Sequence, residues 1–168
     1  MDKPHEYQHI EWIKISKSDR ILNSLIGIQD SLEETKNTKI NIISYLAEWC
    51  PNCHYEALTL RDLYQEYSRF NIRMTLVMNY SDKNKSMNFV ESYGLEMNIL
   101  FGELNQKQED KLAELLFTKF RKMNSDLRKW GTPFHIIIIN GNIENIGIVK
   151  GEFVIKEIND FLIDKLII

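Results

Sequence analysis

Apolar residues in this chain follow two spacings, one typical of strands and the other typical of helices. Alternating or continuous apolar positions predict five strands, at residues 7–15, 40–46, 71–79, 134–139 and 144–149. The strands 40–46 and 134–139 are the richest in apolar residues, which is typical of strands buried on both faces of a sheet. Asn140-Gly141-Asn142 is a hairpin turn signal, so we expect 144–149 to return as an edge strand.

Apolar positions three and four residues apart predict the helices. The predicted helices cover about 18–34, 50–70, 81–93, 106–130 and 154–166. Gly94 would end the third helix. Asn105, with Gln108 three residues later, resembles a capping box, and a long apolar stripe after it predicts one continuous helix as far as Trp130. Residues 95–101 are predicted to be an irregular apolar connection.

The order of these elements predicts an α/β protein. Strands alternate with helices through the first part of the chain, an extra helix follows, and two strands and a helix close it. Such an order favours a mixed central sheet with helices on both faces. We expect residues 1–168 to form a single domain, since a chain of 168 residues can bury most of its apolar surface in one core.

Composition and charge narrow the possible functions. The chain is 43% hydrophobic and 27% charged, with a net charge of −3 and interleaved acids and bases. This balance is typical of an ordinary globular protein and indicates neither a nucleic-acid surface nor a membrane surface. No apolar run approaches the roughly 20 residues that span a bilayer, and the first residues carry no secretion signal. We therefore expect either a cytosolic protein or one that has lost a signal or anchor.

The only two cysteines carry the clearest chemical signal. Cys50 and Cys53 directly follow the predicted strand 40–46 and open the helix that comes after it. At a helix start, backbone N–H groups and the helix dipole favour the thiolate of Cys50. Cys53 lies one turn further along, close enough to form a disulfide with Cys50 or to resolve a mixed one. The motif therefore predicts a redox pair.

Three other interpretations of the two cysteines are weaker. Half of a zinc site would need a second pair of ligands, and the chain has no further cysteines and only scattered histidines. Cys50-Pro51-Asn52-Cys53-His54 matches the haem-attachment pattern, but a buried strand before it and a long helix after it are the wrong context. Cysteines that only pack in a core do not require Trp49 before them and Pro51 between them. We therefore expect no metal and no organic cofactor.

The order of elements around this motif resembles the thioredoxin superfamily over nearly the whole chain. The likeness is specific at Ala47-Glu48-Trp49-Cys50, at the two cysteines, at Thr132-Pro133, and at Gly141 with the closing helix. Cys50, Cys53 and Glu56, together with residues 89–94, are similar to the TlpA-like branch of extracytoplasmic thiol-disulfide oxidoreductases. The resemblance favours the cell envelope over the cytoplasm, and it makes 103–130 a helical insertion before the strand that follows Pro133.

The resemblance implies a role for each site residue. Cys50 would be the nucleophile and Cys53 the resolving thiol. Thr132 and a cis Pro133 would align the backbone of a protein substrate. The remaining candidates are Glu56, as proton acceptor for Cys53, and Trp49 and Pro51, as parts of the substrate-binding surface. The partners would be protein thiols and disulfides and an unidentified redox partner, and we expect a monomer.

Some residues depart from the family pattern or have a simpler interpretation. Ser44 stands where thioredoxin keeps a buried aspartate, and Pro51-Asn52 replaces Gly-Pro, which leaves the redox potential open. Trp49 could be a plain packing aromatic, and Glu56 could be a solvated helix residue. His135 is expected to be a hydrogen-bonded core histidine, and His54 a surface residue near the site. A thioredoxin-like module that only binds a partner remains an alternative function, as does a haem protein.

Overall fold

A computed structural model describes residues 3–16, 21–34 and 38–168 of the chain. Its centre is a mixed sheet of six strands in the order β2-β7-β6-β3-β4-β5. The strands are β2 (Glu11–Lys14), β3 (Ile40–Leu46), β4 (Ile72–Met78), β5 (Asn98–Phe101), β6 (Phe134–Ile139) and β7 (Asn142–Val149). Strands β3, β4 and β5 run parallel, whereas β6, β7 and β2 join the sheet through antiparallel pairs. The predicted α/β class with a mixed central sheet is therefore confirmed.

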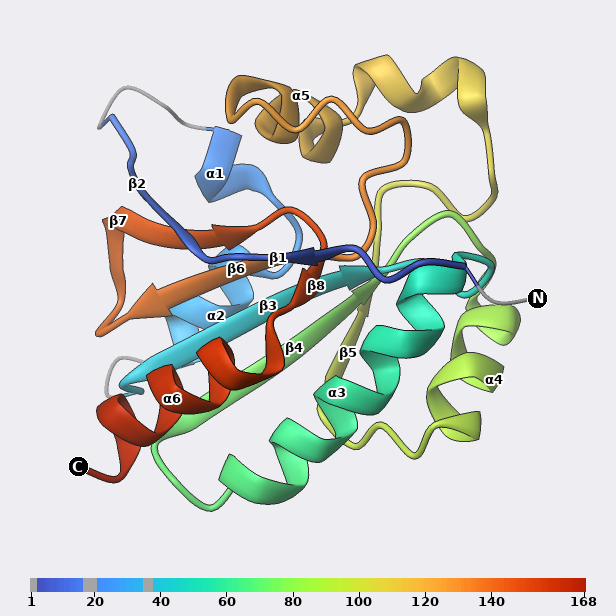
Figure 1. Cartoon of the computed structure of the whole chain (residues 1–168). Helices are drawn as coiled ribbons and strands as arrows, with labels where there is room; N and C mark the ends of the chain where they lie inside the picture. The colour runs from blue at the N-terminus through green and yellow to red at the C-terminus, as the bar shows by residue number, and fades with distance from the viewer. Residues whose placement is uncertain (1–2, 17–20, 35–37) are drawn as a thin grey trace.

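Helices cover both faces of the sheet (Figure 1). On one face lie α3 (Pro51–Tyr67) and α6 (Ile155–Leu166), with α4 (Lys83–Ser92) beside α3. The other face carries α1 (Ile21–Ser24), α2 (Ile28–Glu34) and α5 (Leu116–Met123), which is preceded by a 3₁₀ helix (Glu109–Glu114). Because successive strand residues point to opposite faces, the buried side chains form two cores, one under each helix layer.

The central elements follow the sequence pattern closely. Strands β3 and β6 occupy the predicted ranges, and every residue of β3 is buried. Asn140 and Gly141 both have positive φ, at 53° and 69°, as a tight hairpin between β6 and β7 requires. Asp82 caps α4 by accepting a hydrogen bond from the backbone N–H of Lys85, and Gly94 with φ of 63° follows the helix as predicted.

Four predicted elements are wrong in extent or place. Residues 95–101 contain a strand, β5, which pairs with β4 at the end of the sheet. The hairpin strand β7 is not an edge, because β2 pairs with its free side. The predicted first strand divides into β2 and a short strand, β1 (Tyr7–Gln8), which pairs in parallel with β8 (Glu152–Phe153). The predicted helix 18–34 is interrupted at Gly27, which has φ of 99°, and its expected start at Ser18 lies outside the described residues.

The single long helix predicted for 106–130 is also wrong. This part of the chain contains the short 3₁₀ helix and then α5, which ends at Met123. Ser125 follows with φ of 65°, a left-handed conformation that no α-helix accommodates. Residues 124–133 then run as an irregular segment to β6. Within the described ranges, no helix is long and apolar enough to cross a membrane.

Candidate active site

The two cysteines lie at the junction between the end of β3 and the start of α3. Strand β3 ends at Leu46, and Cys50 occupies the N-cap position of α3 with extended backbone angles. Pro51 follows as the first helical residue, where its missing N–H costs no hydrogen bond. The backbone N–H of Cys53 then donates to the carbonyl of Cys50 at 3.0 Å, which closes the first turn. This geometry brings both cysteines to the positive end of a 17-residue helix.

The two thiols have different surroundings. Both are free, and Cys50 retains 7% of its surface exposed whereas Cys53 is fully buried. The Sγ of Cys50 donates to the carbonyl oxygen of Thr132 at 3.5 Å. The Sγ of Cys53 instead accepts from the backbone N–H of Ala47 at 3.4 Å. An incoming disulfide therefore meets Cys50 first.

These surroundings move the pKa values of the two thiols in opposite directions. A hydrogen bond from the Cys53 thiol lowers the pKa of Cys50 to about 7; burial opposes this shift, and the backbone N–H groups of Cys53 and Asn52 add to it. Burial raises the pKa of Cys53 well above its ordinary value, and the adjacent Cys50 raises it further. Near neutral pH, Cys50 is thus partly a thiolate while Cys53 keeps its proton.

The loop that faces Cys50 contains a cis peptide bond between Thr132 and Pro133, as the resemblance to the thioredoxin superfamily implies. Two arginines hold this loop. Arg121, fully buried, donates to the carbonyl oxygens of Arg128 at 2.9 Å and Lys129 at 3.4 Å. Arg128 in turn donates to the carbonyl oxygen of Pro133 at 3.1 Å. Neither arginine is predicted from the sequence as a site residue, since a basic residue inside a predicted helix gives no sign that it binds loop carbonyls.

Gly131 is required by the same arrangement. Its φ is 73°, and a Cβ atom there would lie 2.0 Å from the Cζ of Arg121. The guanidinium of Arg121 therefore packs directly against the backbone of the loop. Asp126, also buried, lies 3.6 Å from Arg121 and accepts from Arg128 at 2.9 Å, so that a carboxylate lies beside two cations.

Trp49 lies among aromatic side chains on the other side of the cysteines. Its Nε1 donates to the carbonyl oxygen of Tyr80 at 3.2 Å, and its ring meets the ring of Trp130 edge to face at 5.1 Å. The Nζ of Lys107 lies 3.9 Å from the ring centroid, a cation–π contact. Trp49 is half-buried, so part of the ring faces solvent next to Cys50.

Glu56 is buried in the first turns of α3, and the interpretation of it as a solvated residue is wrong. Its Oε2 accepts hydrogen bonds of 2.7 Å from Nε2 of His135 and from the backbone N–H of Phe153. Its Oε1 is buried too, without a hydrogen-bond partner among the described residues. Since Cys53 lies three residues earlier on the same helix, Glu56 and Cys53 share a helix face.

His135 is the hydrogen-bonded core histidine that the sequence predicts, and it links two further residues. Its Nδ1 lies 2.7 Å from Oγ of Ser44, directly across the sheet, and its Nε2 bonds to Glu56. A proton on Nε2 and a hydroxyl of Ser44 that donates to Nδ1 satisfy both ring nitrogens. Ser44, at the position where thioredoxin keeps an aspartate, is therefore hydrogen-bonded through His135 to Glu56.

His54 is half-buried and engaged through both of its ring nitrogens. Nδ1 lies 2.5 Å from the hydroxyl of Tyr93, and Nε2 lies 2.7 Å from the carbonyl oxygen of Glu48. Coordination of a haem iron would require one of these nitrogens to be released. Within the described part of the chain, no three His, Cys, Asp or Glu side chains are grouped as metal ligands.

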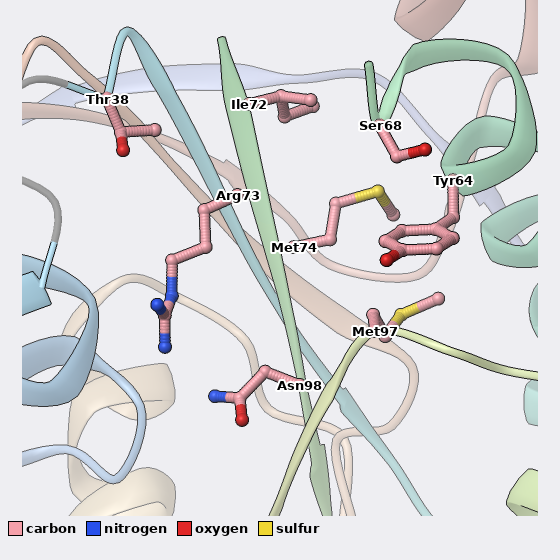
Figure 2. Close-up of a pocket in the computed structure, with 8 residues that line it drawn as sticks. All are labelled: Thr38, Tyr64, Ser68, Ile72, Arg73, Met74, Met97 and Asn98. Carbon is pink, nitrogen blue, oxygen red and sulfur yellow. The ribbon is translucent and has the colours of Figure 1, made fainter. Parts of the chain in front are cut away.

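Two cavities differ in their relation to the cysteines. One of about 430 Å³ adjoins the redox motif and is lined by Glu48, His54, Lys85, Asn88, Phe89, Ser92 and Tyr93. A second, of about 350 Å³, lies at the beginning of β4, with Met74, Met97 and Tyr64 close together on one side (Figure 2). Because β3 and β4 are parallel and the cysteines follow the end of β3, this second cavity lies at the opposite end of the sheet.

Fold and site together define a thioredoxin-like α/β protein with a Cys-x-x-Cys pair at the start of a helix. The family model described as Redoxin matches residues 20–150, and the chain therefore belongs to the Redoxin family. No curated protein sequence matches the chain.

Several solved structures share the fold. One is a secreted disulfide oxidoreductase of Mycobacterium tuberculosis homologous to E. coli DsbE; identity is 14%, the TM-score is 0.56, and 86% of this chain and 96% of that chain are covered. A DsbF homologue from Corynebacterium diphtheriae has 14% identity and a TM-score of 0.56, and the match covers 91% of this chain and 92% of that chain. A thiol:disulfide interchange protein from Chlorobium tepidum has 13% identity and a TM-score of 0.57, and the match covers 79% of this chain and 83% of that chain. The predicted thioredoxin fold is confirmed.

Proposed function

We propose that this protein is a thiol-disulfide oxidoreductase that exchanges disulfides with protein substrates. One observation carries the proposal: Cys50 begins α3 with a pKa lowered to about 7, while its partner Cys53 is buried and protonated. The difference assigns attack to Cys50 and resolution to Cys53. Two structural relatives, one described as a disulfide oxidoreductase and the other as a thiol:disulfide interchange protein, support the same activity.

In the reducing direction, the exchange has two steps. The Cys50 thiolate attacks one sulfur of the substrate disulfide, forms a mixed disulfide, and releases the other substrate sulfur as a thiolate. Cys53 then loses its proton and attacks Cys50, which breaks the mixed disulfide and releases the second substrate thiolate. Two electrons pass from the dithiol to the substrate, and the Cys50–Cys53 disulfide is left. The oxidising direction is the reverse.

Glu56 is the proposed acceptor of the Cys53 proton. The thiol of Cys53 is buried and strongly favours its neutral form, so the second step needs a base. Ser44 lies in the place of the aspartate that serves elsewhere in the superfamily, and a hydroxyl is too weak a base. Glu56 shares the helix face of Cys53 and has one carboxylate oxygen that is without a partner among the described residues.

The substrate is proposed to lie against the loop that contains the cis bond. The backbone of Thr132 would pair with an extended substrate segment, and Pro133 would hold the loop in place beside Cys50. Trp49 and the exposed Pro51 would form the rest of the substrate surface. A location in the cell envelope is supported by one structural relative that is described as secreted. The monomeric state remains a prediction from the sequence.

The reduction of insulin disulfides by dithiothreitol, with and without the protein, tests this proposal. We expect the parent protein to accelerate the reaction and Cys50→Ser to abolish the acceleration. A folded parent protein that leaves the rate unchanged would support the alternative, a thioredoxin-like module that only binds its partner. A Soret band in the absorption spectrum of the purified protein would instead support the haem alternative.

A further inference from the structure

The first described residues of the chain form a strap over the active site. Residues 3–8, here called the N-terminal strap, cross the start of α3 and end in the strand β1 beside β8 (Figure 1). The strap precedes residues 20–150, the region that the Redoxin family model matches. Its contacts reach both sides of the proposed site.

On the helix side, the strap binds the redox motif itself. Asn52, between the two cysteines, is buried, and its side-chain amide donates to the carbonyl oxygen of Pro4 at 2.9 Å. Three residues further along α3, the hydroxyl of Tyr55 donates to the carbonyl oxygen of Lys3 at 2.7 Å. The ring of His5 packs on the ring of Tyr55 with a centroid distance of 4.1 Å.

Glu152 joins the strap to the motif. It is 2% exposed and lies in β8. Its Oε1 is 2.8 Å from Nδ1 of His5, and its Oε2 accepts from the backbone N–H of Glu6 at 2.6 Å. The same Oε2 also accepts from the Asn52 amide at 3.1 Å. One buried carboxylate therefore holds both the strap and the second residue between the cysteines.

On the other side, the strap reaches the loop with the cis bond. The carboxylate of Glu6 lies 3.7 Å from Nη1 of Arg128. Arg128 donates to the carbonyl oxygens of Gly131 at 3.3 Å and Pro133 at 3.1 Å. The strap thus spans the two segments that must face one another across a substrate.

We propose that Glu152 is a positioning residue, which fixes the side chain of Asn52 so that the backbone N–H groups of the motif point at the sulfur of Cys50. The N–H groups of Asn52 and Cys53 lower the pKa of Cys50, and they do so only while the first turn of α3 keeps its geometry. The side-chain amide of Asn52 is anchored by its hydrogen bonds to Pro4 and Glu152.

A positioning role and a simple effect of charge predict opposite changes in the pKa of Cys50 when Glu152 is replaced. A negative charge near Cys50 disfavours the thiolate, so removing it would lower the pKa of Cys50. Loss of positioning would raise that pKa, because the N–H groups would no longer stabilise the thiolate. The two effects have opposite signs, and a single substitution distinguishes them.

The test is the pH dependence of iodoacetamide alkylation at Cys50 in the reduced protein, for Glu152→Ala, Glu152→Gln and Glu157→Ala. Glutamine can keep all three contacts of Glu152: its oxygen accepts from Glu6 and Asn52, and its amide donates to Nδ1 of His5. Glu157 is the matched control. It binds His9 and the backbone N–H of Ile10, at 2.9 and 2.7 Å, just as Glu152 binds the strap, but it does not touch the motif.

We expect Glu152→Ala to raise the midpoint of the alkylation profile by about half a pH unit, a roughly threefold loss of thiolate below the midpoint. Glu157→Ala should keep the parental midpoint, and Glu152→Gln, which keeps the contacts of Glu152 but loses its charge, should not raise it. If Glu152→Ala does not fold, Asn52→Ala cuts the same link from the other end, leaves the charge of Glu152 in place, and should also raise the midpoint. An unchanged or lowered midpoint in the folded variant would overturn the proposal, as would an equal rise in Glu157→Ala.

This proposal rests on the proposed function only through the reactivity of Cys50, and the two can fail separately. A parent protein whose Cys50 does not react near neutral pH contradicts the proposed function. If Cys50 of the parent protein reacts near neutral pH but Glu152→Ala leaves the midpoint of its alkylation profile unchanged, only the positioning role is contradicted.

Discussion

The carboxylate of Glu56 and the imidazole of His135 meet at 2.7 Å in the buried layer between α3 and the sheet. Both side chains are essentially without solvent contact, so neither can exchange its partner for water. The backbone N–H of Phe153 completes the environment of the same carboxylate oxygen, and the ring of Phe153 stacks on His135 with centroids 3.8 Å apart. Glu56 is therefore fixed in place one helical turn beyond Cys53.

Glu56→Gln should slow the resolution of mixed disulfides. The amide keeps the volume of the side chain but cannot take the proton of Cys53, and general-base groups contribute about a hundredfold or more to such steps. We expect a loss of at least about tenfold in turnover at pH 7, with a changed pH dependence. Steady-state rates between pH 5 and 9 measure this, with Glu66→Gln, exposed on the same helix, as control. Superimposable profiles for Glu56→Gln and the parent would rule out the role.

Glu56→Ala should destabilise the fold in addition. It leaves the N–H of Phe153 and Nε2 of His135 buried without an acceptor, and such losses cost about 2–4 kcal/mol together. Denaturant unfolding of the reduced proteins at pH 7 measures the difference in free energy of unfolding. Glu66→Ala, which removes an exposed carboxylate from α3, should change it by less than about 0.5 kcal/mol. Similar effects of the two substitutions would contradict the buried network.

The pH dependence of alkylation should separate the two cysteines. Because the pKa of Cys50 is lowered to about 7, its reaction with iodoacetamide should rise between pH 6 and 8 with a midpoint near 7. Cys53, buried and with a raised pKa, should stay unmodified over this range. Mass spectrometry of peptides after timed alkylation gives both rates. Equal modification of the two residues at pH 7 would contradict the assignment of roles.

Asp126 should stabilise the protein in a pH-dependent way. Burial alone would raise the pKa of its carboxyl, but hydrogen bonds from Arg128 and the charges of Arg128 and Arg121 outweigh burial and lower it. The folded state therefore favours the carboxylate. The stability that results is present above the unfolded-state pKa of about 4 and is lost as the pH falls through the lower folded-state pKa.

Asp126→Asn should accordingly cost about 2–3 kcal/mol of unfolding free energy at pH 7 and much less near pH 2. Chemical unfolding of parent and variant at several pH values measures this difference. Asp62→Asn serves as control, since Asp62 pairs with Arg61 on the surface and such pairs contribute at most about 1 kcal/mol. A cost that does not depend on pH would show that Asp126 acts by packing and not by its charge.

The sheet was predictable from the sequence where strands are buried on both faces. Strands β3 and β6 need apolar side chains at nearly every position, and this makes their limits visible. Strand β5 has no such mark, because it is four residues long and pairs with β4 on one side only. The place of β7 inside the sheet could not be predicted from the sequence either. Its second neighbour, β2, comes from the other end of the chain.

The periodicity of apolar residues over 106–130 did not indicate where the helix ends. The stripe places Phe120 and Leu127 on one face, but Phe120 is fully buried and Leu127 is 79% exposed. After α5, the carbonyl oxygens of Arg128 and Lys129 accept hydrogen bonds from the buried side chain of Arg121. A pattern of apolar positions cannot report that a buried cation holds this segment by its carbonyl groups.

The cysteines and the cis bond of the site were predictable because their residues are neighbours in the sequence or match a family motif. The strap was not, since the contact between His5 and Glu152 spans 147 positions of the chain. Both residues are unremarkable in the sequence, one in a terminal segment and one before the last helix. Only the folded chain brings the carboxylate of Glu152 beneath Asn52.

Trapping of mixed disulfides tests the central claim, that Cys50 attacks and Cys53 resolves, most directly. Reduced Cys53→Ser and Cys50→Ser would each be incubated with a disulfide-containing protein such as insulin, quenched with acid, and separated on non-reducing gels with peptide mass spectrometry. We expect Cys53→Ser to accumulate a covalent adduct through Cys50, and Cys50→Ser to form none. An adduct that forms equally through Cys53, or no adduct with either variant, would contradict the account.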